Sequence, residues 1–138
     1  MTQKTNNNFY METTNQIKIS VQPTYLADQS TPHDQHYVWA YHIRIENLGS
    51  DKVQLLNRHW RIADANGTMQ EVRGPGVVGE QPVIDPGCIF EYSSGTPLKT
   101  TSGIMMGSFE MASANGEHFD AIVPTFSLDI PDQKVQIH

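Results

Sequence analysis

The sequence is short of cysteine and of long apolar runs, and each shortage excludes a class of protein. Cys88 is the only cysteine among 138 residues, so no intrachain disulfide can form and a disulfide-stapled scaffold is excluded. No apolar run approaches the roughly 20 residues of a membrane-spanning helix. Residues 1–16 also lack the apolar stretch of a signal peptide. We therefore expect a cytoplasmic protein without a membrane span.

Cations are scarce as well. Nine Lys and Arg stand against fifteen Asp and Glu, which gives a formal net charge of −6. A protein that follows a phosphate backbone needs a basic face, so general nucleic-acid binding is not expected. With 38% hydrophobic and 17% charged residues, the chain has the composition of one folded domain.

Apolar and polar residues alternate along several short segments, which is the pattern of half-buried β-strands. The alternation is clearest at residues 17–22 and 37–45. In residues 53–63 its phase changes near Leu55, which predicts a bulge. Further strands are expected at residues 69–73, 88–92, 104–112, 118–123 and 126–130.

Turn residues separate these segments. Asn66-Gly67 and Asn115-Gly116 predict tight hairpins, and Pro86-Gly87 predicts another turn. No segment shows a helical stripe, so the chain is expected to be all-β, a two-sheet sandwich of the immunoglobulin/fibronectin type III-like kind. The expected organisation is a disordered N-terminal tail at 1–16, a sandwich domain at 17–131 and a C-terminal tail at 132–138.

A set of specific motifs extends over the chain from Ile17 onward. The motifs are Asn57-Arg58-His59-Trp60, Asp64-Ala65-Asn66-Gly67, EVRGPGVVGEQP at 71–82, Pro86-Gly87, Tyr92-Ser93-Ser94-Gly95, Pro97-Leu98 and GIMMGSF at 103–109. With them the chain resembles the bacterial ApaG family. The resemblance implies a fibronectin type III-like sandwich and a non-enzymatic domain that binds a protein partner. It also implies a role linked to cobalt and magnesium resistance or efflux, because the family carries that association by name.

Residues 74–79 match the pattern G-x-G-x-x-G. In a dinucleotide-binding fold this motif opens a helix, which Pro82 and Pro86 prevent here. Two interpretations stay open: a structural loop whose glycines adopt unusual backbone angles, or a nest of backbone amides that binds an anion. In the second, a phosphate or nucleotide ligand is held by Arg73, Gly74, Gly76, Gly79, His59 and Arg61.

The strand positions of the nearby cations bear on this candidate anion site. On a regular strand Arg58 projects to the opposite face from His59 and Arg61. Cross-strand pairing with Glu71 on a solvated face is the alternative to ligand binding for these cations.

Metal-ligating and nucleophilic groups show no constellation. His33, Asp34 and His36 share one loop but lack the spacing of a zinc site. Cys88 shares its parity with Phe90 and Tyr92, which predicts a buried, inert thiol. No catalytic residue, metal or cofactor is therefore predicted. Of the open functions, the sequence favours an interaction module, as a monomer or as a weak homodimer through its edge strands.

Overall fold

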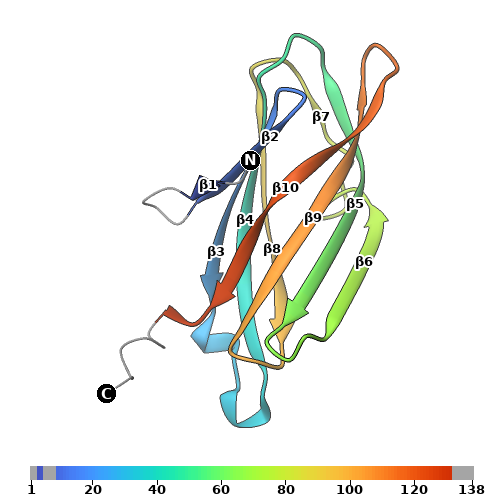
Figure 1. Cartoon of the computed structure of the whole chain (residues 1–138). Helices are drawn as coiled ribbons and strands as arrows, with labels where there is room; N and C mark the ends of the chain where they lie inside the picture. The colour runs from blue at the N-terminus through green and yellow to red at the C-terminus, as the bar shows by residue number, and fades with distance from the viewer. Residues whose placement is uncertain (1–2, 5–8, 132–138) are drawn as a thin grey trace.

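The computed structural model describes residues 3–4 and 9–131, which form two antiparallel β-sheets packed face to face (Figure 1). One sheet has the order β1-β2-β3-β4-β8, with bounds Gln3–Lys4, Tyr10–Thr14, Ile17–Tyr25, Tyr37–Asn47 and Ile89–Leu98. The other has the order β10-β9-β5-β6, with bounds His118–Asp129, Ser102–Ser113, Val53–Asp64 and Met69–Pro75; β7 (Val83–Ile84) pairs with β5. The predicted all-β sandwich is confirmed.

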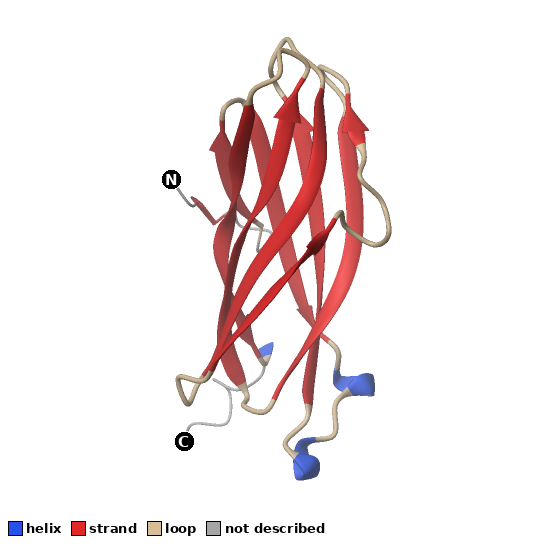
Figure 2. Ribbon diagram, turned by 90° about the vertical axis from the view of Figure 1, so that its right-hand side faces the viewer, coloured by secondary structure: helices blue, strands red, loops and turns tan. Residues whose placement is uncertain are grey.

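Two short 3₁₀ turns, η1 (Ala27–Gln29) and η2 (Pro32–Asp34), lie at one end of the sandwich (Figure 2). Both turns lie in the segment that connects β3 to β4. No helix in the described part of the chain is long and apolar enough to cross a membrane.

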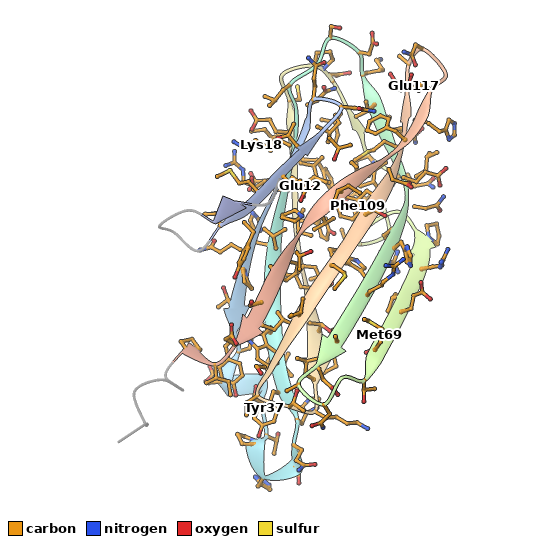
Figure 3. The ribbon with its side chains drawn as sticks, in the orientation of Figure 1. Glu12, Lys18, Tyr37, Met69, Phe109 and Glu117 are labelled. Carbon is orange, nitrogen blue, oxygen red and sulfur yellow. The ribbon has the colours of Figure 1, made fainter. Side chains whose placement is uncertain are left out.

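The core fills the space between the two sheets, because most of the long strands turn one apolar face inward. Phe109, labelled in Figure 3, lies in this interior and is fully buried. The side chains buried around it come from both sheets: Ile17, Ile19, Val21, Trp39, Tyr41, Ile43, Ile45, Leu55, Trp60, Ile62, Met105, Met111, Val123, Phe126 and Leu128.

Two bulges keep the apolar residues pointing inward. The register between β5 and β9 shifts between Leu55 and Asn57, so that Leu55 and Trp60 both reach the core. This confirms the bulge predicted near Leu55. A second shift, between Val123 and Phe126, lies within β10. The prediction of two strands at 118–123 and 126–130 is therefore wrong: they are one strand, bent at a bulge that reverses the alternation.

The N-terminal boundary of the domain also needs correction. Residues 10–14 were expected in a disordered tail, but they form β2 and pair with β3, Tyr10 opposite Val21. Asn15 and Gln16 make the hairpin turn, with φ of 47° and 66°. An Asn-Gly pair would have predicted this left-handed turn from the sequence, whereas Asn-Gln does not. The remaining residues of the expected tails (1–2, 5–8 and 132–138) lie outside the described residues.

The two margins of the sandwich differ. At one margin β10 contacts β2 and β3 of the other sheet. At the other margin β6 ends one sheet and β8 ends the other. Two hollows of about 760 and 380 Å³ lie there, lined by residues of both edge strands, and they share Ile62, Gln70 and Pro97. We call the two hollows together the β6/β8 groove.

Candidate functional site

The cations of the predicted anion site do come together, on the outer face of β5 and β6. His59 lies directly opposite Arg73, and Arg61 opposite Glu71. Glu71 lies among all three: its Oε2 is 2.5 Å from His59 Nε2, 3.2 Å from Arg73 Nη2 and 4.0 Å from Arg61 Nε. The hydrogen bond from His59, followed by that from Arg73, holds the pKa of Glu71 below its ordinary value. A carboxylate of the protein itself thus occupies the position between these cations.

The surroundings of this cluster are not strongly basic. A hollow of about 460 Å³ on the same face is lined by Arg58, His59, Arg73, Gly74, Glu110 and Asp120, among others. The pKa of Glu110 is also lowered, first by a hydrogen bond from Asn57 and then by one from His118. The ionised carboxylates of Glu71 and Glu110 offset the charges of Arg61, Arg73 and, when it is protonated, His59. Little excess positive charge is left for a polyphosphate.

The glycine-rich loop already uses some of its amides in hydrogen bonds to backbone carbonyls. The Gly76 N–H donates to the Leu56 carbonyl at 2.8 Å. Val77 and Glu80 exchange two hydrogen bonds, of 2.8 and 2.9 Å, across a tight turn whose central residues, Val78 and Gly79, have φ of 43° and 81°. These left-handed angles are typical of a type I′ turn. Two amides of the expected anion nest at residues 74–79, those of Gly76 and Val77, therefore already have carbonyl partners.

At two positions of the motif, the close packing of the loop leaves little or no room for a Cβ atom. A Cβ on Gly76 would lie 2.2 Å from the Glu80 carbonyl oxygen, and a Cβ on Gly74 would lie about 3.0 Å from the Arg58 guanidinium. The G-x-G-x-x-G spacing thus fits the structural-loop interpretation. Binding of an anion by its amides stays a prediction.

The anion site predicted from the sequence does not include Arg58. It projects inward, as its parity with Trp60 and Ile62 predicts, and lines the smaller hollow of the β6/β8 groove. Its Nη1 donates to the carbonyls of Pro75 and Gly76 at 2.9 and 3.0 Å. The same hollow is lined by Tyr41 and Tyr92. Burial raises the pKa of both tyrosines, although the nearby Arg58 charge opposes the rise.

A hydrogen-bonded chain of Ser93, His42 and Glu91 lies on the outer face of the first sheet. His42 Nδ1 is 2.8 Å from Ser93 Oγ, and its Nε2 is 2.7 Å from Glu91 Oε1. This is the connectivity of a catalytic triad. Ser93 lies opposite His42, while Glu91 lies two residues away on β8, opposite Arg44. None of the three side chains lines a hollow described above. An oxyanion hole needs free donors around a concave site, so the geometry fits a surface hydrogen-bond network better than a nucleophile.

The other residues considered from the sequence are the histidines and aspartate of residues 33–36 and the thiol of Cys88. His33 and Asp34 lie 3.7 Å apart on the exposed η2 turn. Within residues 3–4 and 9–131 no three His, Cys, Asp or Glu side chains gather as a metal site would require. The prediction of a buried Cys88 is wrong, because β8 begins one residue later, at Ile89, and Cys88 lies exposed in the preceding turn.

Fold and geometry together define a two-sheet β-sandwich domain with one open margin. Comparison with known proteins then gives the family. The ApaG domain matches residues 27–113. The chain is 57% identical over 129 residues to "Protein ApaG" of Paramagnetospirillum magneticum, covering 94% of this chain and 99% of that protein. It is 59% identical over 122 residues to "Protein ApaG" of Rhodospirillum centenum, covering 88% and 94%.

A solved structure described as an ApaA protein from Bordetella pertussis superposes with a TM-score of 0.82 at 46% identity, over 83% of this chain and 94% of that one. The chain belongs to the ApaG family.

Proposed function

We propose that this ApaG-family chain is a non-enzymatic protein-interaction module that binds an extended segment of a partner protein along the β6/β8 groove. One observation carries the proposal: two strand edges with unused backbone groups flank the same groove. β6 is hydrogen-bonded on one side to β5, and β8 on one side to β4. An extended segment can pair with such an edge and place alternate side chains into the adjoining hollows.

The charge of the groove favours one kind of partner segment. The whole chain has a formal charge of −6, yet the groove lining holds two permanent cations, Arg58 and Lys99, against one carboxylate, Asp64. Electrostatic complementarity selects partners and guides their approach. We therefore expect the bound segment to carry acidic side chains among apolar ones.

The two other functions weighed from the sequence have less support. For polyphosphate or nucleotide binding at the Gly74–Gly79 loop, Glu71 competes with the ligand for Arg73 and His59. A role linked to cobalt and magnesium resistance or efflux stays a prediction from the family resemblance.

Selection of phage-displayed random peptides on the folded protein tests the proposal. Selected peptides are titrated into ¹⁵N-labelled protein, and we expect amide shifts along β6 and β8. Gln70→Trp places bulk inside the groove at an exposed position and should abolish binding. The control is Met69→Trp, which places the same bulk one residue away on the outer face, where Met69 is 54% exposed (Figure 3). Peptides that lose affinity for Met69→Trp and keep it for Gln70→Trp would contradict the proposal.

A further inference from the structure

We infer that the 380 Å³ hollow beneath the Val77–Glu80 turn is a binding site for a carboxylate group, held by Arg58. The inference does not depend on the partner segment proposed above. The hollow is within the size range of small-molecule sites. Its lining comes from both sheets and combines aromatic, aliphatic and neutral polar residues, and Arg58 is its one charged lining residue.

Arg58 differs from the other arginines in having no ion pair among the described residues. Arg44 lies 3.6 Å from Glu91, while Arg61 and Arg73 lie 4.0 and 3.2 Å from Glu71. Arg58 is half-buried, and no described Asp or Glu lines the hollow. A partly desolvated cation that is met only by neutral carbonyls is stabilised when an anion joins it.

The guanidinium is held ready for such a partner. Nη1 uses its hydrogens on the carbonyls of Pro75 and Gly76, at 2.9 and 3.0 Å. The group lies across the bare Cα of Gly74, where a Cβ would come within 3.1 Å of Nη1 and Cζ. The remaining three N–H groups, two on Nη2 and one on Nε, are available to a ligand. Nε and Nη2 can donate two parallel hydrogen bonds, which match the two oxygens of a carboxylate. Because the side chain is already fixed, binding costs little rotamer entropy.

The residues that line the hollow determine which chemical group can accompany the carboxylate of the ligand. The lining combines the partly exposed Val72 and the buried Trp60, Val77 and Met105 with the polar Gln70, Ser94 and Thr96, next to the single cation. A monocarboxylate with a small apolar body matches this arrangement, whereas a doubly charged phosphate would need further donors. The Tyr92 hydroxyl in the same wall is buried without a hydrogen-bond partner, so the site also has unused polar capacity.

Titration of phenylacetate into ¹⁵N-labelled protein tests the inference on the native chain. We expect saturable shifts centred on the amides of Val77–Gly79 and of Ser94–Thr96. Phenylacetamide, which keeps the shape and loses the charge, should bind about tenfold more weakly. Equal binding of the amide, or tighter binding of inorganic phosphate than of phenylacetate, would overturn the assignment. These comparisons need no variant, so they hold even if Arg58 is required for folding.

Two variants locate the site. Arg58→Met removes the charge and keeps the apolar stem, and we expect the loss of phenylacetate binding. Arg73→Met removes a cation from the outer face and should leave the affinity unchanged. The reverse pattern would place the carboxylate on the outer face and refute the inference. Short peptides that differ by one Glu or Gln form the second arm: a Glu peptide that binds there more tightly than phenylacetate assigns the carboxylate to a partner segment, and the opposite order assigns it to a free small acid.

Discussion

Tyr92 carries a hydroxyl group that the sandwich buries without satisfying it. Its ring contributes to the core beside Phe90 and Phe109, with centroids 6.2 and 6.5 Å away. A buried donor without a partner keeps its full desolvation cost. We therefore expect Tyr92→Phe to leave the fold unchanged and to raise the free energy of unfolding by up to about 1 kcal/mol.

Urea denaturation measures this change, and Tyr41→Phe is its control. Tyr41 is equally buried, but its hydroxyl hydrogen-bonds with Ser94, so the control should lose about 1 kcal/mol. A clear loss of stability in Tyr92→Phe would mean that its hydroxyl has a partner in solution.

Gly76 is the glycine of the loop that the structure constrains most. Its φ is +62°, and a Cβ would lie 2.2 Å from the Glu80 carbonyl oxygen, a backbone atom that the turn holds in place. Gly76→Ala should therefore destabilise the protein by about 2–4 kcal/mol, from backbone strain and overpacking together. Gly67→Ala is the matched control, since Gly67 has φ +85° and nothing within 4 Å of the added Cβ; it should cost only about 1 kcal/mol. Thermal or urea unfolding of both variants measures the two losses of stability. Similar losses in Gly76→Ala and Gly67→Ala would contradict the steric argument.

Paired strands hold three histidine–glutamate contacts on the outer faces of the two sheets: His42 with Glu91, His59 with Glu71, and His118 with Glu110. The hydrogen bond from its histidine is the largest cause that lowers the pKa of Glu71 and of Glu91, while that of Glu110 is lowered first by Asn57. A carboxyl whose pKa is lower in the folded state stabilises that state at every pH above its unfolded value, near 4.5. This contribution is lost as the pH falls through the folded pKa.

Melting temperature measured between neutral pH and pH 3 checks this consequence for β5 and β6. The wild type should lose stability progressively below about pH 4.5. Glu71→Gln, which cannot ionise, should show a smaller fall over the same range. A variant with the same acid dependence as the wild type would show that the Glu71 contacts do not contribute. Because the carboxylate is exposed, added salt should reduce the difference.

Whether the sequence could predict an element depended on how strongly one face of that element is apolar. Strands such as β4 were predictable because Trp39, Ile43 and Ile45 repeat every second residue and all reach the core. The second half of β8 was not, since its inward-facing Ser94 and Thr96 are polar, and pairing with β4 makes it a strand. The inward direction of Arg58 followed from parity. Its lack of an ion pair depends on which strands surround it, which no local pattern contains.

At the scale of the whole molecule, the N-terminal strand β2 closes one margin of the sandwich. It pairs with β3 along its length and contacts β10 of the other sheet. Tyr10 places its ring 6.2 Å from that of the buried Phe126. The Ile122 N–H of β10 donates to Thr14 Oγ1 at 3.2 Å. The sandwich thus has one margin covered by β2 and one left open beside the β6/β8 groove.

Removal of β2 should therefore weaken the domain without changing its groove. A chain that begins at Ile17 loses the partly buried Tyr10 and Met11 and uncovers the edge of β3, so we expect the free energy of unfolding to fall by roughly 2–4 kcal/mol. A chain that begins at Phe9 keeps β2 and is the control. Urea denaturation compares the two, and size-exclusion chromatography reports whether the uncovered β3 edge causes self-association. Equal stability of both chains would mean that the folded unit begins at Ile17 and that β2 is dispensable.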